Sequence, residues 1–406
     1  MIRVAFINHY GGVPAGAERS LEAYLRRIPS DIDPYVFLFE EGAYADRVRA
    51  LNIPVHIVPA SRRLMAASRA DIDASHALDG ILQVFRLRKL LKSVDVDVVV
   101  TNSMKAHIAG AIAARLCGIP VVTWLKELPD GFTLKLIRFV SRTCATERIG
   151  CSRAVVRHLG LPRSTALVPP LDLPTYGPAP SAEAAKASLG LPPEKLIFSI
   201  VGRIARIKGQ DCFVRAAARV CESQISNVHF AIVGSPTFPQ DHDFVPELAR
   251  LTTQLGMTER VSFIPWLDDP RVAYAASDLL CNASSAEGFG RTSVEAALYG
   301  VPALCFDEGG ANEAVLPAVT GTVVPAGNVE AFAAAMVAYA ADPVALRRAG
   351  AAARVYAQRH DADRLANAFF EIIRRASLKR AWHKAAALPP RAAIAETSIP
   401  VVAGRT

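Results

Sequence analysis

The chain has 406 residues, of which 51% are hydrophobic and 21% charged, and this balance excludes a disordered, collagen-like or coiled-coil protein. Because single cores stop growing at about 250 residues, the length predicts two domains. The net charge of +8 favours an anionic partner but does not choose among nucleotide phosphates, acidic lipids and nucleic acid.

The first half of the sequence alternates β-rich runs with helical patterns. The expected strands are 2–8, 35–40, 54–58, 96–101, 120–124, 147–151 and 165–168, and the expected helices are 17–28, 81–93, 105–117 and 133–142. This alternation predicts an α/β fold with a doubly wound parallel sheet, and we assign residues 1–170 to an N-terminal Rossmann-like domain.

A second α/β series follows a proline-rich linker, which we place at 171–190. Its expected strands are 196–201, 228–233, 261–264, 278–282, 302–306 and 321–324, and its closing helices are 329–341, 344–358 and 361–378. We therefore predict a C-terminal domain at 191–360, a last helix at 361–378 and a disordered tail at 388–406.

Neither a signal peptide nor a membrane span is expected. The first apolar run turns polar at Asn8, and no run of about 18 apolar residues occurs. We expect a cytoplasmic protein. The seven scattered cysteines and nine histidines lack metal-ligand spacing, so no metal site is predicted.

Three loops at expected strand ends are candidates for ligand binding, because ligands of open α/β sheets bind at the carboxyl ends of the strands. The first loop, 11–18, contains Gly16 and opens a helix whose free N–H groups suit an anion. A plain tight turn is the alternative.

The second loop, 201–209, carries Arg203 and Lys208. A guanidinium fork and an ammonium that converge above the strand ends would neutralise a diphosphate. A solvated basic turn is the alternative, and the spacing is not that of a Walker A loop.

The third loop, 286–297, is the most specific. It places Glu287 before a helix and Glu295 one turn into it, so both carboxylates would face one pocket and accept hydrogen bonds from sugar hydroxyls. The amides of 290–293, which include Thr292 and Ser293, would point at phosphate. In the alternative interpretation, Glu287 caps the helix and Glu295 faces solvent.

Four motifs together carry a family resemblance: Gly16-Ala-Glu18, Gly202-Arg203-x-x-x-x-Lys208-Gly209, Glu287-Gly-Phe-Gly-x-x-x-x-Glu295 and Gly309-Gly310-x-x-Glu313. Over about residues 1–375 the chain resembles family 4 of the retaining GT-B glycosyltransferases. The resemblance implies two Rossmann-like domains that face each other across a cleft, a nucleotide-diphosphate sugar as donor, and no metal or other cofactor. It also implies that the helix at 361–378 crosses back to the first domain.

The resemblance also implies roles for individual residues. Arg203, Lys208, Gly16, Thr292 and Ser293 would bind the donor diphosphate, Glu295 the ribose, and Glu287, Gly288, Phe289 and Gly290 the transferred sugar. Glu287, Lys126 and Glu127 are the candidates for catalysis.

One position departs from the family. Many members carry a histidine that contacts the donor sugar after the strand that ends near Trp124, and Lys126 stands there in this chain, followed by Glu127. A lysine donates hydrogen bonds but lacks the two-sided role of neutral imidazole. The donor sugar is then unusual, or Lys126 is displaced and activity is reduced.

The acceptor side is less informative. Lys135, Arg138 and Arg142 share one face of a predicted helix, which would suit an anionic membrane surface or a lipid-linked acceptor. Solvated faces of an ordinary crossover helix are the alternative. The cations lack the aromatic interleaving of a nucleic-acid site, so no nucleic acid is expected.

These observations predict a glycosyltransferase that moves a sugar from a nucleotide-diphosphate donor to a carbohydrate or lipid-linked acceptor. Synthesis of cell-surface polysaccharide, lipopolysaccharide or glycolipid is the expected process, with peripheral contact at the inner face of the membrane. The alternatives are a nucleotide-sugar epimerase of the same fold and a non-catalytic nucleotide-sugar-binding scaffold.

Overall fold

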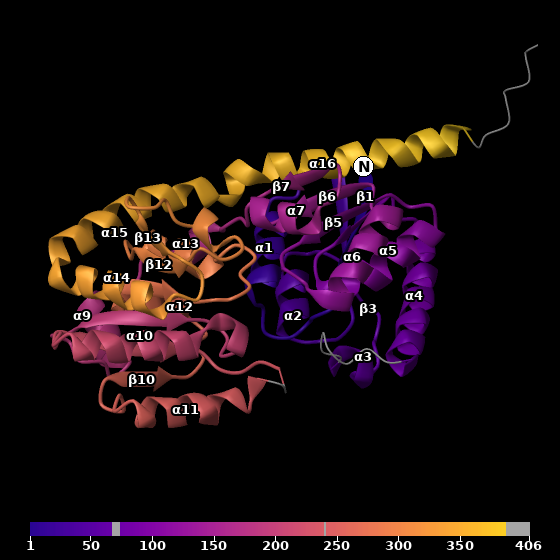
Figure 1. Cartoon of the computed structure of the whole chain (residues 1–406). Coiled ribbons are helices and arrows are strands. Elements are labelled where there is room, and N and C mark those ends of the chain that lie inside the picture. Colours follow the sequence, from indigo (N-terminus) through magenta and orange to yellow (C-terminus); the bar gives the residue numbers. More distant parts are fainter. Residues whose placement is uncertain (67–73, 239–240, 387–406) are drawn as a thin grey trace, which may run out of the picture.

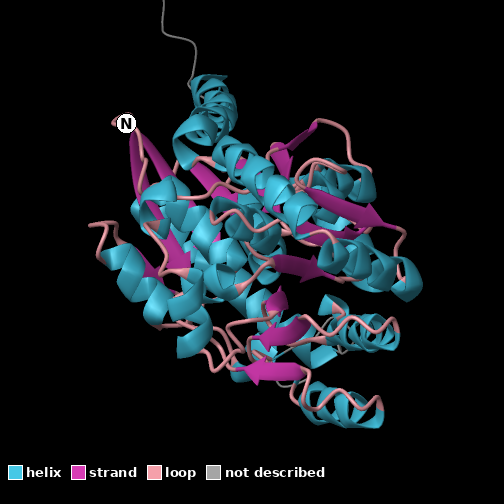
Figure 2. Cartoon of the chain, turned by 90° about the vertical axis from the view of Figure 1, so that its left-hand side faces the viewer, coloured by secondary structure: helices cyan, strands magenta, loops and turns pink. Residues whose placement is uncertain are grey.

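The computed structural model describes residues 1–66, 74–238 and 241–386. The tail predicted at 388–406 lies outside these residues. Two parallel sheets form the framework, with helices on both faces of each (Figures 1 and 2). This arrangement confirms the predicted fold class.

The N-terminal sheet has seven parallel strands in the order β3-β2-β1-β4-β5-β6-β7. The strands are β1 (Ile2–Asn8), β2 (Ile32–Leu38), β3 (Val55–Ile57), β4 (Val98–Thr101), β5 (Val121–Leu125), β6 (Glu147–Gly150) and β7 (Ser164–Ala166). Its central strands are buried along their whole length, as expected for strands covered by helices on both faces.

Two layers of helices cover this sheet. The helices α1 (Gly16–Leu25) and α2 (Ala43–Arg49) pack on one face, and α4 (Ala74–Val94), α5 (Met104–Leu116) and α6 (Gly131–Cys144) pack on the other. The short helices α3 (Arg62–Ala66) and α7 (Arg153–Leu159) complete the domain.

The C-terminal sheet has six parallel strands in the order β10-β9-β8-β11-β12-β13. They are β8 (Leu196–Val201), β9 (Val228–Val233), β10 (Val261–Ile264), β11 (Leu279–Asn282), β12 (Ala303–Phe306) and β13 (Gly321–Val324). The order repeats that of the first sheet, so the winding reverses between β1 and β4 in one domain and between β8 and β11 in the other. These are the two places where ligands of such sheets bind.

The helices of the second domain flank its sheet in the same manner. They are α10 (Gln210–Glu222), α11 (Phe244–Gln254), α12 (Pro270–Ala276), α13 (Arg291–Leu298), α14 (Val329–Ala341) and α15 (Pro343–Ala357), with the 3-10 turns η1 (Arg206–Lys208), η3 (Ala311–Glu313) and η4 (Gln358–His360). A core that includes Phe198, Phe213 and Phe332 fills the space between the sheet and α10, α11 and α14.

The chain crosses between the domains twice at one place. The predicted linker 171–190 contains two short helices, α8 (Leu173–Tyr176) and α9 (Ala182–Ser188). At the second crossing, α16 (Ala362–Ala386) leaves the C-terminal domain and runs along the N-terminal one (Figure 1), where Phe369 and Ile373 enter the core. The two crossings touch, because the Leu171 amide donates to the His360 carbonyl at 2.7 Å.

In the three described ranges, no single helix is both long and apolar enough to cross a bilayer. Among the described helices, α14 and the following segment Pro343–His360 are together long and apolar enough to span a bilayer, but they are bent by 103° relative to each other.

Candidate functional site

The site lies where the carboxyl ends of the two sheets face each other. The backbones of the two domains touch there, because a Cβ added at Gly288 would lie 2.0 Å from the Lys126 carbonyl oxygen. Likewise, a Cβ at Gly310 would lie 2.7 Å from the Ser152 hydroxyl. Only glycine permits such approaches, which explains why two of the sequence motifs contain it.

Glu287 and Lys208 form a half-buried ion pair at the reversal point of the C-terminal sheet. The Lys208 ammonium, on η1, donates to Glu287 Oε2 at 2.7 Å, and the Ser284 hydroxyl and the Gly290 amide donate to the same carboxylate at 3.0 and 3.2 Å. Burial alone would raise the pKa of Glu287, but Lys208 and the two other donors outweigh it and lower the pKa. Glu287 is therefore ionised and pre-oriented at neutral pH.

Arg203 does not share this carboxylate. Its guanidinium is paired with Asp241 and lies over the Phe238 ring at 4.8 Å from the ring centre. The structure thus gives Arg203 and Lys208 separate acidic partners. Arg206, between them on η1, is exposed and paired with Glu247.

Glu295 lies in the first turns of α13 and is almost completely buried. The Tyr176 and Tyr274 hydroxyls donate to its two oxygens, each at 2.7 Å, and Arg291 Nε donates at 2.6 Å. Burial opposes ionisation, but the charge of Arg291 and these hydrogen bonds lower the pKa of Glu295. The alternative of a solvent-facing Glu295 is wrong.

Arg291 is the central cation of the interface, and sequence reasoning missed it. Its guanidinium donates across the cleft to the Ser20 hydroxyl at 2.7 Å and to the Pro170 carbonyl at 2.9 Å, in addition to Glu295. Its aliphatic stem faces Gly16, where an added Cβ would lie 3.4 Å from Arg291 Cδ. Arg291 thus occupies the space between the predicted diphosphate residue Gly16 and the predicted ribose residue Glu295.

The other predicted residues of this loop have different surroundings. Thr292 is half-buried at the start of α13, and Ser293 is buried with a hydroxyl that has no hydrogen-bond partner among the described residues. Phe289 packs into an interdomain apolar cluster beside His360, so it contributes to the site through its backbone. Glu18 caps its own helix by accepting from the Ala15 amide at 3.2 Å.

Lys126 follows β5 at the opposite side of the cleft. Its ammonium donates to Asn102 Oδ1 and lies 3.3 Å from the centre of the Trp124 ring. Burial lowers the pKa of Lys126 to about 7, although Glu18 opposes the shift. Lys126 and Glu127 line a small cavity with His107, so both predicted residues reach the N-terminal reversal point.

Two further groups at this point were not predicted as site residues. The His9 ring follows β1, and its buried Nδ1 has no hydrogen-bond partner in the described part of the chain, while burial lowers its pKa to about 3. Burial also lowers the pKa of Lys105 to about 8, and its ammonium donates to the Met65 carbonyl. Both residues follow the end of a strand, His9 by one residue and Lys105 by four, and this position in the sequence could have identified them as site candidates.

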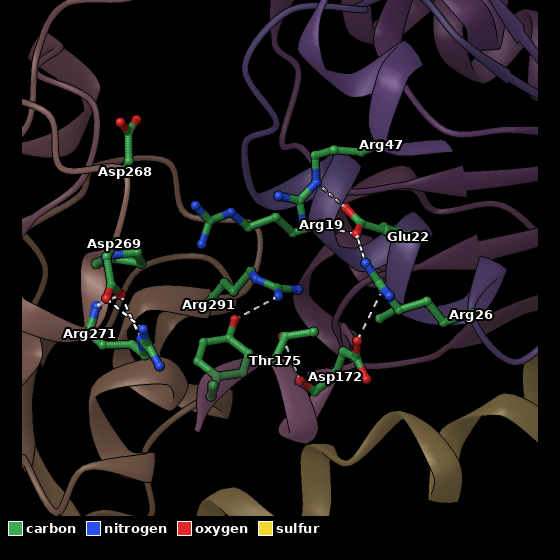
Figure 3. Close-up of a pocket in the computed structure, with 13 residues that line it drawn as sticks. Arg19, Glu22, Arg26, Arg47, Asp172, Thr175, Asp268, Asp269, Arg271 and Arg291 are labelled. Atoms are coloured by element: carbon green, nitrogen blue, oxygen red, sulfur yellow. Dashed lines mark hydrogen bonds and ion pairs between the residues drawn. The ribbon is translucent and has the colours of Figure 1, made fainter. Parts of the chain in front are cut away.

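A cavity of about 280 Å³ opens beside Glu295, between α1 and the start of α12 (Figure 3). Its walls are strongly charged. Arg26 and Arg47 pair with Glu22 at 2.7 and 2.9 Å on the N-terminal side. Arg19 extends across the gap toward the opposite wall.

Glu313, from the glycine-containing motif on η3, also joins the domains. Its carboxylate accepts from the Arg153 and Ala154 amides, at 2.9 and 2.8 Å, at the start of α7. A carboxylate at the free N–H groups of a helix is favourable, so this contact stabilises the interface between the two domains.

The basic face predicted on 134–142 is present on α6. Lys135, Arg138 and Arg142 are exposed. Arg138 also donates to the His158 and Leu159 carbonyls at 2.6 and 2.9 Å, so it anchors α6 to α7. The side chains of Lys135 and Arg142 form no hydrogen bond or ion pair with the residues that the structure describes. Within the described ranges, no group of three His, Cys, Asp or Glu side chains is arranged to hold a metal ion.

Comparisons with known proteins agree with this geometry. Residues 181–356 match the family model of the glycosyl transferases group 1. A D-inositol 3-phosphate glycosyltransferase of Rhodococcus opacus is 32% identical over 232 residues, which are 56% of this chain and 52% of that protein. The chain thus spans about half the length of the curated relatives it matches first. A similarly named protein of Catenulispora acidiphila is 29% identical over 71% of this chain and 75% of its own length.

Solved structures extend the likeness to the whole fold. Anabaena HepE, in complex with UDP and glucose, superposes with a TM-score of 0.78 and 25% identity over 92% of this chain and 99% of its own. The chain therefore has the GT-B fold of glycosyltransferases, and its C-terminal domain carries the glycosyl transferases group 1 match.

Proposed function

We propose that the chain is a retaining glycosyltransferase of family 4, which moves a sugar from a nucleotide-diphosphate donor to a carbohydrate or lipid-linked acceptor. The observation that carries the proposal is the Lys208–Glu287 pair, held at the reversal point of one sheet, where the next residue, Gly288, contacts the backbone of Lys126 from the other domain. A fixed cation and a fixed carboxylate at such a point suit a phosphate and the hydroxyls of a sugar.

The roles of the residues follow from their positions. Lys208, the first amides of α13 and Arg203, once released from Asp241, bind the diphosphate and stabilise it as it leaves, so transfer needs no metal. Glu287 binds the transferred sugar and Glu295 the ribose, because a carboxylate accepts several hydrogen bonds. Lys126 and Glu127 face the sugar and the acceptor from the N-terminal side.

A uridine nucleotide is the first donor to test. HepE, which is 25% identical, was solved with UDP and glucose, and this supports the same nucleotide here. We further propose assembly of cell-surface polysaccharide, lipopolysaccharide or glycolipid in the cytoplasm, with peripheral contact at the membrane. The basic face of α6 supports the last point.

Calorimetry with UDP-, GDP- and ADP-glucose tests the donor assignment. Lys208→Ala removes one charge-assisted hydrogen bond and should weaken binding of the preferred nucleotide sugar at least about tenfold. Arg206→Ala is the matched control, because this cation lies two residues away and is paired outward with Glu247. Unchanged affinity in Lys208→Ala would contradict the diphosphate assignment.

Product analysis then separates the classes of function. The proposed enzyme consumes donor only when acceptor is present and, because Lys208 and the amides of α13 take the place of a metal in this proposal, is unaffected by a metal chelator. Isomerised donor in the absence of acceptor would indicate an epimerase, and donor binding without turnover on any acceptor would indicate a scaffold.

A further inference from the structure

Helix α4 exposes an apolar stripe that no part of the described chain covers. Leu78, Ile81, Leu82 and Phe85 have exposed fractions of 59, 52, 46 and 56%. Their spacing of three, four and seven residues puts them on one face of the helix. The opposite face is already occupied, because Leu87 and Leu91 are buried in the core beneath α5.

Cations continue the same face toward the end of α4. Lys89 and Lys92 lie one and two turns beyond Phe85, are exposed, and form no ion pair within the described ranges. Arg62 and Arg63 are exposed on α3, which packs beside the start of α4. The described parts of 62–94 hold six Lys or Arg and one acid, Asp79.

This surface adjoins the N-terminal side of the candidate site. Lys105, at the start of α5, donates to the Met65 carbonyl on α3. The same α5 start follows Asn102, which accepts from Lys126. Crossover helices begin at the carboxyl edge of a sheet, so the apolar first half of α4 lies at the edge where the site opens.

We propose that the exposed face of α4 docks on an anionic lipid bilayer, with the apolar stripe inserted and Lys89 and Lys92 on headgroup phosphates. A helix with an apolar and a cationic surface lies in the membrane interface. Lysine is depleted at protein–protein interfaces, so the charge pattern favours lipid over a protein partner. Exposed Phe132 and Phe139 on α6, on the other side of α5, extend the same contact.

This inference deepens the proposed function, because it brings a lipid-linked acceptor to the N-terminal side of the cleft. It concerns membrane binding alone, and the donor affinity measured by calorimetry is independent of it. Absence of vesicle binding with intact donor binding would overturn this inference and the proposed membrane contact, and would leave the proposed sugar transfer standing.

Flotation with vesicles of phosphatidylcholine, with or without phosphatidylglycerol, tests the proposal on the full chain. The wild type should bind only the anionic vesicles and be released by high salt. The double variant Leu82→Ser/Phe85→Ser should lose at least about tenfold in the partition coefficient for each side chain. Lys89→Gln/Lys92→Gln should lose about fivefold for each lysine.

A matched control uses two other exposed apolar residues. Val344 and Val355 on α15 are 65 and 75% exposed, and Val344→Ser/Val355→Ser should bind vesicles like the wild type. Absence of wild-type binding, or equal loss in the control, would overturn the proposal. So would a dimer in light scattering that Leu82→Ser/Phe85→Ser converts to a monomer, because the stripe would then serve a second copy of the chain.

Discussion

The Arg291–Glu295 pair offers the sharpest test of how the interface is held. The side chains of Arg291 and Glu295 are 12 and 6% exposed, and their closest approach is 2.6 Å. Arg291→Met keeps a side chain of similar length and removes the charge. The variant leaves Glu295 buried with two tyrosine hydroxyls as its only donors among the contacts described above.

The size of the effect follows from these contacts. Breaking a buried ion pair by removing one partner costs about 3–5 kcal/mol, because the remaining charge is left uncompensated. Tyr176 and Tyr274 still stabilise the carboxylate, and Ser20 keeps its bond to the Gly16 carbonyl at 2.7 Å. We therefore expect the lower end, about 3 kcal/mol.

The assay is urea denaturation of Arg291→Met, Glu295→Gln and the double variant. Their cycle should give a coupling free energy of about 2–3 kcal/mol. The control cycle uses Arg271 and Asp269, which lie 2.7 Å apart at the surface and should couple far more weakly, because solvent screens an exposed pair.

The dependence on pH supplies a second readout. A carboxylate with a lowered pKa stabilises the fold above its ordinary pKa and loses that contribution as the pH falls. Because Arg291 lowers the pKa of Glu295, the difference between wild type and Arg291→Met should shrink as the pH falls through the ordinary range of a glutamate carboxyl and below it. A coupling below about 1 kcal/mol, or a difference that does not change with pH, would refute the reasoning.

Three further variants test other features. Because burial lowers the pKa of Lys126 to about 7 and that of Lys105 to about 8, the unfolded chain binds more protons above these pH values, and wild-type thermal stability should rise from pH 7 toward about pH 9. Lys126→Met should lose the part of this rise that begins at pH 7 and keep the part that begins near pH 8. Gly288→Ala would place a Cβ 2.0 Å from the Lys126 carbonyl oxygen of the other domain, so small-angle scattering should show a more open molecule, and an unchanged radius of gyration would contradict this. Gly80→Ala, with nothing within 4 Å, should keep that radius and raise the free energy of unfolding by about 0.5–1 kcal/mol in urea.

Secondary structure could be predicted from local patterns because each strand is a short apolar run that ends in a turn. One strand begins well before its predicted position. The strand expected from residue 35 begins at Ile32, because Pro34 resembles a turn signal in the sequence. Pro34 is tolerated because β3 pairs with β2 only from Val36 onward, so no neighbour on that side requires its missing N–H.

The positions of the candidate site residues also followed from strand ends, but their pairing did not. Arg203 lies 38 residues from Asp241, and Tyr176 lies 119 residues from Glu295. Tyr176 belongs to a four-residue helix inside the predicted linker, where a lone tyrosine gives no periodic signal. Which charges meet depends on how two domains are placed, and no local pattern encodes that placement.

The paired crossings of the chain constrain how the cleft opens. Arg27 ties them together by binding Asp172 and Asp363, beside the bond from Leu171 to His360. With both connections gathered at one point, any rotation of the domains about it would separate groups in proportion to their distance from that point. Arg291 contacts the Pro170 carbonyl close to it. A rotation that opens the cleft would therefore stretch this contact less than the contacts at the far side of the interface.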